Sequence, residues 1–419
     1  MKKTAAIILA AGKGTRMKSE LPKVLHPVCG RPMLLYVLDA AKELRLSGAV
    51  VVLGYKHEEV RKVLPPSVKS ALQPQMRGTA DAVARGLPQL KGFKGDILVL
   101  YGDTPLLTAA TIKRLMARHS QSGAAATILT AVMDDAAGYG RILRDTRGMI
   151  TGIVEDKDAD AFQKTIKEIN TGIICFNGER LAQCLKLVRP NNRKKEYYLT
   201  DVIGILVKKN ELVESVETPS AKEALGVNSR VELAEANTVM RYRINEIHMK
   251  NGISIIDPAS AFISHGTRIG SDTIIYPFTV IEKDVKIGKR CSIGPFCRLR
   301  PGTRLRDDVS AGNFIEISRS HLSQGTRAKH FGFIGDARIG CRVNIGAGTV
   351  TANYDGIHKS ITRLGDKVFI GSDTVLVAPC AVGKGGRTGA GSVVVKKKIP
   401  AGATYVGVPA KPLKKKIIP

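Results

Sequence analysis

The sequence predicts two domains in series: an α/β domain built on a mostly parallel sheet, followed by a parallel β-helix. Short strands alternate with helical segments through residues 1–228, and aliphatic residues recur at every sixth position through residues 253–419. The first pattern is typical of an open sheet covered by helices, and the second of a coil of short flat strands. The length of 419 residues agrees, because one hydrophobic core rarely serves more than about 300 residues.

Apolar runs in residues 1–228 mark the strands of the first domain, and amphipathic segments between them mark its helices. The predicted strands are Ala5–Ala10, Ala49–Leu53, Asp96–Tyr101, Ala125–Val132 and Gly172–Phe176. The predicted helices include Met33–Leu44, Thr79–Gly86 and Ala109–Ser120. Strands that alternate with helices favour parallel pairing, with helices on both faces of the sheet.

The N-terminal apolar run has a second interpretation, because Met1-Lys2-Lys3 resembles the basic start of a signal peptide. The run from Ala5 to Ala11 leads directly into Gly12-Lys13-Gly14, without a longer apolar stretch or a cleavage site. We therefore interpret it as a buried strand. No window approaches the roughly 20 apolar residues that cross a bilayer, so no membrane span is expected.

Residues 229–252 are predicted to link the two domains through one helix, Ser229–Lys250. Ser229 suits the N-cap, and Asn251-Gly252 supplies a stop. The apolar residues expected on one stripe of this helix are Leu233, Met240, Ile244 and Ile247.

The six-residue period begins after this helix. Its members are Ile263, Ile269, Ile275, Ile281, Ile287, Ile293, Leu299 and Leu305, continued by Ala311 and Ile317. The phase shifts through Ser318–Lys329, resumes at Phe333, Ile339 and Ile345, shifts again after the loop Ala352–Ile361, and runs on through Leu364, Ile370, Leu376, Val382 and Val394. This period fits three strands per coil of 18 residues, each with one aliphatic side chain pointing inward. A purely structural coil without chemistry is the alternative that the period leaves open.

Composition limits the classes of function. The seven cysteines are scattered without a C-x-x-C pair, which favours a reducing compartment and hence the cytoplasm over a disulfide framework or a zinc site. The formal net charge of +28 attracts polyanions in general. Aromatic residues make up only 5% and Trp is absent, so nucleic acid is not the expected partner. Phosphorylated small molecules would use a few of these charges, and the surplus has no explanation from the sequence.

A glycine-rich turn follows the first strand, in the sequence Leu9-Ala10-Ala11-Gly12-Lys13-Gly14-Thr15-Arg16-Met17. Such a turn lets backbone N–H groups approach phosphate oxygens, and Arg16 and Lys23 add positive charge. Alone this is a weak signal, because it is neither a Walker loop nor G-x-G-x-x-G. Asp103 in Tyr101-Gly102-Asp103 strengthens it, since a carboxylate at the carboxyl end of a buried strand can anchor Mg²⁺ beside a triphosphate. A helix or turn cap is the alternative role for Asp103.

Further motifs follow in a fixed order along the chain. They are Leu21-Pro22-Lys23-Val24-Leu25, Gly138-Tyr139-Gly140-Arg141-Ile142, Ile153-Val154-Glu155, Glu168-Ile169-Asn170-Thr171-Gly172, Glu196-Tyr197-Tyr198-Leu199-Thr200-Asp201 and Gly226-Val227-Asn228. With the glycine turn and Tyr101-Gly102-Asp103, this set resembles the bifunctional N-acetylglucosamine-1-phosphate uridyltransferase/glucosamine-1-phosphate acetyltransferases of bacterial cell-wall precursor synthesis, over nearly the whole chain. The resemblance implies a Rossmann-like nucleotidyltransferase domain followed by a left-handed parallel β-helix of hexapeptide repeats that forms a homotrimer.

The resemblance also implies roles for residues of the first domain. Gly14 and Arg16, with Lys23 beside them, would contact the phosphates of UTP, and Gln73, Gly78 and Thr79 would hold the uracil. Leu9, Ala10, Ala11 and Gly12 would also bind the nucleotide. Asp103 and Asn228 would bind Mg²⁺. Tyr101, Gly140, Glu155, Asn170, Thr200 and Asn228 would hold the sugar. Arg16 and Lys23 would be catalytic, neutralising the charge that develops as pyrophosphate leaves.

In the β-helix the resemblance implies that His330 is the base for acetyl transfer, and Glu316 is a candidate to orient it. Arg300, Asn344 and Tyr354 would bind the acetyl acceptor, and Asn353, Tyr354, Ser372 and Ala390 would bind acetyl-CoA. Read without the resemblance, a lone His is more often a surface or packing residue.

Three positions depart from the family pattern. Ser318 stands where the family has a phosphate-binding Lys, Phe333 where it has a substrate Tyr, and Gly407 where it has a CoA-contacting Arg. Lys411 or Lys414-Lys415-Lys416 could supply the missing cation near the C-terminus. Two alternatives therefore stay open beside the bifunctional enzyme: a uridylyltransferase whose β-helix serves trimerisation or a different acceptor, and a non-enzymatic binding module.

Overall fold

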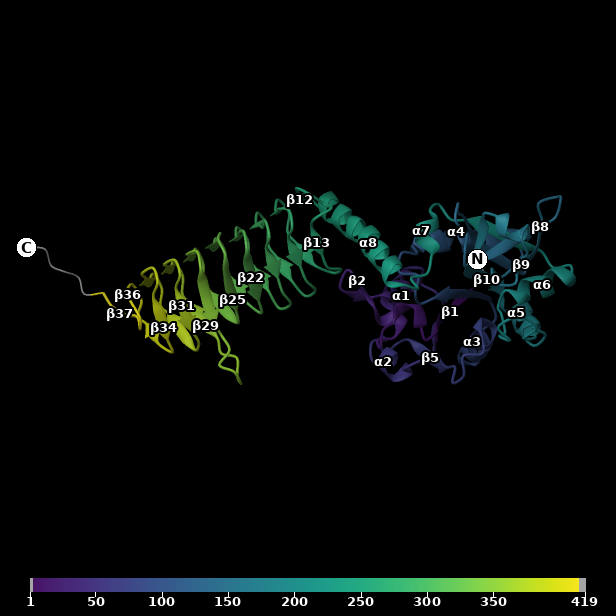
Figure 1. Cartoon of the computed structure of the whole chain (residues 1–419), viewed down its shortest axis with the longest axis horizontal. Helices are drawn as coiled ribbons and strands as arrows, with labels where there is room; N and C mark the ends of the chain where they lie inside the picture. The colour runs from purple at the N-terminus through teal and green to yellow at the C-terminus, as the bar shows by residue number, and fades with distance from the viewer. Residues whose placement is uncertain (1–2, 414–419) are drawn as a thin grey trace, which may run out of the picture. The chain divides into compact units, whose positions relative to one another are not determined.

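The structure is a computed structural model that describes residues 3–413. The chain divides into two compact units, Met1–Asn237 and Thr238–Pro419 (Figure 1). Each unit carries one of the two periodicities of the sequence. Among the described residues, no helix is both long and apolar enough to span a membrane.

The first unit is built on a nine-stranded mixed sheet in which β1 pairs in parallel with both β4 and β6. Its main strand order is β11-β7-β10-β6-β1-β4-β5, and β8 and β9 form a hairpin attached to β10. The strands are β1 (Thr4–Ala10), β4 (Ala49–Leu53), β5 (Lys69–Leu72), β6 (Asp96–Tyr101), β7 (Ala126–Val132), β8 (Gly140–Arg144), β9 (Ile150–Val154), β10 (Glu168–Asn177) and β11 (Val213–Glu217). A separate hairpin joins β2 (Pro27–Val28) to β3 (Arg31–Pro32).

Helices cover both faces of this sheet. Successive residues of β1 alternate between two hydrophobic clusters, because neighbouring side chains of a strand point to opposite faces. One cluster includes residues of α3 (Thr79–Gly86), α5 (Gly178–Leu185) and α6 (Asp201–Lys208). The other includes residues of α1 (Met33–Glu43), α2 (His57–Arg61) and α4 (Ala109–Ser122). The remaining short helices are α7 (Ala221–Ala224), η1 (Thr15–Met17), η2 (Lys23–Leu25), η3 (Leu87–Leu90) and η4 (Gln163–Thr165).

The five strands and three helices expected in the first domain are all confirmed, with small changes at their ends. The predicted linker helix is α8 (Arg230–Lys250), and Ser229 caps it as expected. The Ser229 hydroxyl accepts the Glu232 N–H at 3.2 Å, and the Glu232 carboxylate accepts the Ser229 N–H at 2.8 Å, which forms a capping box. The predicted apolar stripe is wrong at Ile247, which is 58% exposed.

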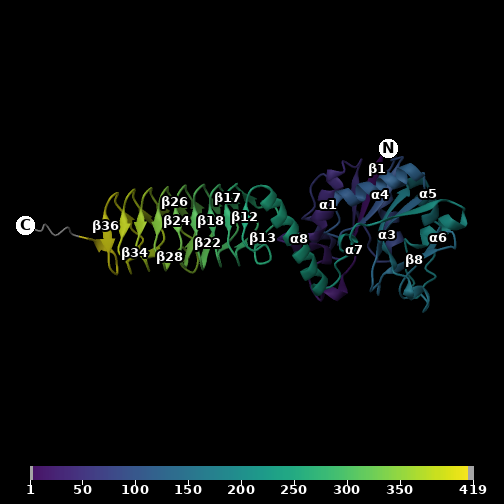
Figure 2. The ribbon, with the colours of Figure 1, turned by 90° about the horizontal axis from the view of Figure 1, so that it is seen from above.

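The second unit is a coil of three sheets, in which each strand up to β33 pairs in parallel with the third strand after it, and β36 pairs antiparallel with β37 at the end of the coil. Figure 2 shows the coils following one another from β12 to β36. The first face consists of β12 (Ser254–Ile255), β15 (Ile274–Ile275), β18 (Ser292–Ile293), β21 (Ser310–Ala311), β24 (Arg327–Ala328), β27 (Asn344–Ile345), β30 (Phe369–Ile370), β33 (Arg387–Thr388), β36 (Thr404–Val406) and β37 (Lys411–Pro412). The second face consists of β13 (Phe262–Ile263), β16 (Val280–Ile281), β19 (Arg298–Leu299), β22 (Ile315–Ser318), β25 (Gly332–Gly335), β28 (Thr349–Ala352), β31 (Val375–Val377) and β34 (Val393–Val395). The third face consists of β14 (Arg268–Ile269), β17 (Lys286–Ile287), β20 (Arg304–Leu305), β23 (His321–Leu322), β26 (Ala337–Ile339), β29 (Thr362–Leu364), β32 (Cys380–Val382) and β35 (Lys398–Ile399).

The inward aliphatic residues form the core of this coil, as the six-residue period predicts. Ile275, Ile281, Ile293 and Leu299 are fully buried. The prediction that the phase resumes at Phe333 is wrong. Strand β22 pairs with β25, which places Phe333 beside Glu316 and Ile334 beside Ile317. Ile334 is therefore the core residue, and Phe333 lies on the outer side. The corner between the second and third faces is one residue shorter in these coils, and this moved the register.

Candidate active site

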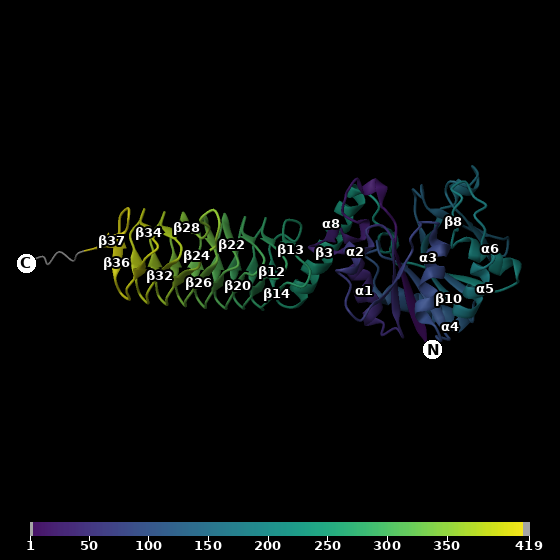
Figure 3. The same cartoon turned by 90° about the horizontal axis from the view of Figure 1, so that it is seen from below.

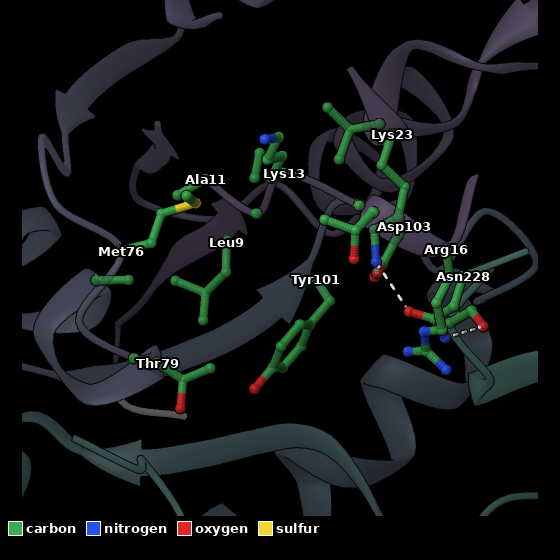
Figure 4. A pocket seen from close by; sticks show the side chains of 18 of the residues that line it. Leu9, Ala11, Lys13, Arg16, Lys23, Met76, Thr79, Tyr101, Asp103 and Asn228 are labelled. Atoms are coloured by element: carbon green, nitrogen blue, oxygen red, sulfur yellow. Dashed lines mark hydrogen bonds and ion pairs between the residues drawn. The ribbon is translucent and has the colours of Figure 1, made fainter. Parts of the chain in front are cut away.

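A pocket of about 610 Å³ lies in the first unit where β1 and β6 end (Figure 4). The carboxyl edge of an open α/β sheet is where such folds bind ligands. Most of the predicted nucleotide and metal residues line this pocket: Leu9, Ala10, Ala11, Gly12, Gly14, Arg16, Lys23, Gln73, Gly78, Thr79, Tyr101, Asp103 and Asn228. The fold therefore brings together segments that are far apart in the sequence.

The glycine turn has room only for glycine at position 14. Gly14 adopts φ 64°, a conformation that residues with a side chain rarely take, and a Cβ there would lie 2.6 Å from Cβ of Lys23. The close packing fixes the start of the Lys23 side chain against the turn. Arg16 lines the same pocket and is exposed, so its guanidinium group is available to a ligand.

We expect Gly14→Ala to raise the KM for UTP and lower kcat, together by about tenfold or more, because strain of about 1–3 kcal/mol falls on the turn and on Lys23. Gly152→Ala in β9 is the matched control, since a Cβ at position 152 meets no atom within 4 Å and Gly152 lies outside the pocket. Steady-state kinetics of both variants check this, and equal effects at the two positions would contradict it.

In the pocket, two side-chain oxygens from distant parts of the sequence contact the same ammonium group. The Lys23 ammonium donates to the Asp103 carboxylate and to Oδ1 of Asn228, the latter at 3.0 Å (Figure 4). The Asn228 amide is oriented by its own hydrogen bond to the Gly226 carbonyl at 2.9 Å. Carboxylate and amide oxygens are ligands that Mg²⁺ accepts, so the residues present fit a divalent ion.

A divalent ion here would depend on the substrate for further ligands. Within residues 3–413, no group of three or more His, Cys, Asp or Glu side chains could hold a metal ion. Mg²⁺ commonly binds through one or two protein oxygens, with substrate phosphates and water completing its six ligands. Asp103 and Asn228 match this pattern.

The predicted uracil end lies at the start of α3. Gln73 is only 3% exposed, and its amide N–H₂ donates to the Gly78 carbonyl at 3.0 Å and to Asp81 at 2.8 Å. These bonds leave the Gln73 carbonyl oxygen to face a ligand. A Cβ on Gly78 would lie 2.4 Å from the Tyr197 carbonyl, so the start of α3 and the irregular segment at Tyr197 approach as closely as glycine allows.

The predicted sugar residues lie around Tyr101 and Glu155. The Thr200 hydroxyl donates to Glu155 at 3.0 Å, while Oδ1 of Asn170 accepts the Gly172 N–H at 2.9 Å. Burial, and then the carboxylates of Glu155 and Asp103, raise the pKa of Tyr101. Of this predicted set, Tyr101 and Asn228 line the pocket, whereas Gly140, Glu155, Asn170 and Thr200 do not.

A cluster of carboxylates lies beside the sugar end. Burial raises the pKa of Asp201 to about 6, with further contributions from Glu155 and Asp158. The folded chain therefore binds a proton at Asp201 more tightly than the unfolded chain does. Binding of this proton stabilises the folded chain. That contribution to the free energy of unfolding is fully present below about pH 4, falls as the pH rises through about 6, and is absent above that range.

We expect Asp201→Asn to raise the thermal unfolding midpoint of the first unit, by more at pH 7.5 than at pH 5, because the buried charge is absent from the variant. Asp134→Asn is a control of opposite sign, since the hydrogen bond from Lys167 lowers the pKa of Asp134. Calorimetry at the two pH values checks both variants. A gain for Asp201→Asn that does not change with pH would contradict this prediction.

Several residues that line the pocket were given no role from the sequence. Lys194 lines the pocket, and its charge lowers the pKa of Glu155, although burial raises that pKa overall. The run Arg193-Lys194-Lys195 just before Glu196 was the available signal. Tyr139 and Thr171 also line the pocket, and both lie inside motifs whose other members had been assigned roles.

A second, smaller pocket of about 250 Å³ lies on the first face of the β-helix. It brings together His330, Asn344 and Ser372, all predicted site residues, along with Lys329 and Phe369. Arg300, Asn353, Tyr354 and Ala390 do not line it. Glu316 accepts from the Arg300 guanidinium at 2.8 Å on the second face and is not part of the His330 pocket, so its suggested orienting role gains no support.

Two parts of the chain match models of known protein families, and nearly the whole chain is similar to known proteins. Residues 6–150 match the family model described as a MobA-like NTP transferase domain, and residues 266–301 match the bacterial transferase hexapeptide model of six repeats. The bifunctional protein GlmU of Geobacillus thermodenitrificans (strain NG80-2) is 43% identical over 97% of this chain and 96% of its own. The chain belongs to the GlmU family. Other GlmU proteins are similar to it: that of Pelotomaculum thermopropionicum (strain DSM 13744 / JCM 10971 / SI) is 46% identical over 90% of this chain and 89% of its own, and that of Bacillus subtilis (strain 168) is 43% identical over 94% of each.

The three positions that the sequence predicts to depart from the family pattern lie in the β-helix. Ser318 is buried, and Arg319 beside it cannot replace a free cation, because its guanidinium group pairs with Asp336 through two bonds of 2.7 and 2.8 Å. Phe333 lies on the outer side of the second face, next to Glu316. Gly407 is exposed and adopts φ 88°. Lys411 is exposed on β37, while Lys414-Lys415-Lys416 lies outside the described residues.

Proposed function

We propose that this GlmU-family chain makes UDP-N-acetylglucosamine in two reactions. The first unit transfers a uridylyl group from UTP to N-acetylglucosamine 1-phosphate, and the β-helix transfers an acetyl group from acetyl-CoA to glucosamine 1-phosphate. The observation that carries the first activity is the convergence of Asp103 and Asn228 on one cation beneath the glycine turn. We place the chain in the cytoplasm, where the thiols of the seven cysteines would stay reduced.

In the first reaction a phosphate oxygen of the sugar phosphate attacks the α-phosphorus of UTP. The bond between the α-phosphorus and its bridging oxygen breaks, and pyrophosphate leaves with the electron pair. The sugar phosphate is already ionised at neutral pH, so no general base is needed. The chain contributes by holding the two phosphates in line, and such positioning can supply much of the rate.

The charges of the pocket stabilise this transfer. Backbone N–H groups of the glycine turn and the guanidinium group of Arg16 face the leaving phosphates, and Lys23 adds an ammonium group at the same edge. When bound, Mg²⁺ held by Asp103 and Asn228 would supply positive charge to phosphate oxygens. In this structure the oxygens of Asp103 and Asn228 contact the Lys23 ammonium group. With the ion held by those two oxygens, Lys23 would be available to contact the phosphates.

In the second reaction the amine of glucosamine 1-phosphate attacks the thioester carbon of acetyl-CoA. His330 takes a proton from the amine, the C–S bond breaks, and CoA leaves as its thiol after protonation. His330 is exposed in its pocket, as a base that meets a substrate must be. Ala390 follows the next strand of the same face after Ser372. Arg300, Asn353 and Tyr354 follow strands of the second face and lie outside that pocket, and we propose that a homotrimer brings them to the site of a neighbouring copy.

A uridylyltransferase with a different or absent acetyl acceptor is the second candidate. Its support is specific: Ser318 carries no charge, and Arg319 is occupied by Asp336. Mass spectrometry of products from UTP, acetyl-CoA, Mg²⁺ and either glucosamine 1-phosphate or its N-acetyl form separates the two. UDP-N-acetylglucosamine from both sugars supports the bifunctional enzyme. Product from the N-acetyl form alone, without release of CoA thiol, supports the second candidate, and product from neither sugar contradicts both.

A further inference from the structure

A row of basic side chains runs along the third face of the β-helix. Strand pairing places Arg268, Lys286, Arg304, His321, Arg338 and Arg363 at the same outward position of successive coils. Lys398 extends the row after one interruption at Ala381. The strands β14, β20, β26 and β32 follow one another along this side of the coil in Figure 3. With paired strands about 4.8 Å apart, the row is about 34 Å long.

This row is not explained by the stability of the coil. Like charges directly opposite each other on paired strands are destabilising. Asp284 pairs with Arg304 at 2.6 Å, but among the described residues no ion pair involves Arg268, Lys286 or Arg363. Burial, and then the neighbouring charges of Arg306 and Arg338, lower the pKa of His321. The face therefore concentrates positive potential that the fold itself does not neutralise.

The proposed chemistry does not use this face either. His330, Asn344, Ser372 and Ala390 lie on the first face or directly after its strands, and Arg300, Asn353 and Tyr354 directly follow strands of the second face. If copies meet through the faces that hold the acetyl-transfer residues, the third face stays open to solvent. The basic side chains of this face are also exposed in the chain itself, except for the half-buried Arg304 and His321.

The shape of the row limits the partner. The strands of the third face carry no aromatic residue, so single-stranded nucleic acid would find no side chain on which to stack its bases. The strands of a DNA duplex turn once in about 34–36 Å, which is about the length of the row. The phosphates of the duplex would therefore lie close to only some of the basic side chains. A flat surface of negative charge meets every cation of the row at once.

We propose that the third face of the β-helix binds the anionic surface of a lipid bilayer. Lys and Arg residues near such a surface each contribute to binding, and clusters of four to eight are typical of lipid-binding proteins. The contact is electrostatic and peripheral, with no segment inserted into the bilayer. It gives part of the +28 net charge a purpose that small phosphorylated substrates do not. It is independent of the two proposed reactions.

Co-sedimentation of the full chain with vesicles tests this proposal. One set of vesicles is phosphatidylcholine alone, and the other contains an equal part of phosphatidylglycerol. We expect binding only to the second set, weakened by added salt. The triple variant Arg268→Gln, Lys286→Gln, Arg363→Gln should bind about a hundredfold more weakly.

A triple variant of equal charge is the control, built from exposed lysines of the first unit: Lys62→Gln, Lys91→Gln and Lys208→Gln. It should keep vesicle binding, and both triple variants should keep the thermal unfolding midpoint of the chain. Equal loss in the two variants, or equal binding to neutral vesicles, would overturn the proposal. So would binding of a labelled DNA duplex through this face at a salt concentration where vesicles do not bind, since nucleic acid would then be the partner.

Discussion

Asp103→Ala is expected to abolish UDP-sugar formation, lowering kcat/KM by roughly a thousandfold or more. The variant loses the carboxylate that would anchor Mg²⁺, and the ion's stabilisation of transferred charge is worth several kcal/mol. The substitution also removes one of the two hydrogen-bond partners of Lys23, so that only Asn228 of this pair remains. Release of pyrophosphate, measured over a range of UTP and N-acetylglucosamine 1-phosphate concentrations, checks the prediction.

Two controls separate loss of chemistry from loss of fold. Asp39→Ala removes another carboxylate of the first unit, paired with Arg31 at 2.7 Å but outside the pocket, and it should keep full activity. Acetyl transfer by the Asp103→Ala protein should also continue, because His330 lies in the second unit. Normal pyrophosphate release by Asp103→Ala would remove the metal assignment.

His330→Ala is expected to lower acetyl transfer by about a hundredfold to ten-thousandfold, the usual contribution of a general base, while uridylyl transfer is unchanged. The residual rate should rise with pH, because deprotonated amine then becomes available without a base on the protein. Release of CoA thiol as a function of pH checks both statements.

His57→Ala, in α2 of the first unit, is the control for loss of a histidine, and it should leave both reactions intact. An acetyl-transfer rate for His330→Ala that equals wild type at neutral pH would exclude this base. If wild type itself releases no thiol with any amino-sugar phosphate, the β-helix serves another purpose, as the altered positions Ser318, Phe333 and Gly407 allow.

The sequence predicted the fold well because both periodicities are strong. Strand β1 buries every residue, and the inward residues of the coil repeat without a slip from Ile263 to Leu305. The period failed where one corner of the coil is shorter by a residue, since a change of one residue exchanges the inner and outer sides of a strand. Phe333 and Ile334 are adjacent and both apolar, so composition alone could not place the shift.

The nucleotide end of the site was predictable because its residues sit on tight turns at strand ends. Gly14, Lys23 and Asp103 fall into one pocket for this reason. The contact of Lys23 with the oxygens of Asp103 and Asn228 was not predictable, because it depends on the path of a long side chain between distant segments. In the β-helix, the predicted residues lie on two faces, and one chain brings together only His330, Asn344 and Ser372.

The most direct measurement is a crystal structure with UDP-N-acetylglucosamine and Mn²⁺, in which anomalous scattering locates the ion. The proposed function requires a peak bonded to both Asp103 and Asn228, with the Lys23 ammonium moved from the carboxylate to the phosphates. A nucleotide bound away from the glycine turn, or Lys23 still bridging Asp103 and Asn228 with the ion elsewhere, would contradict it.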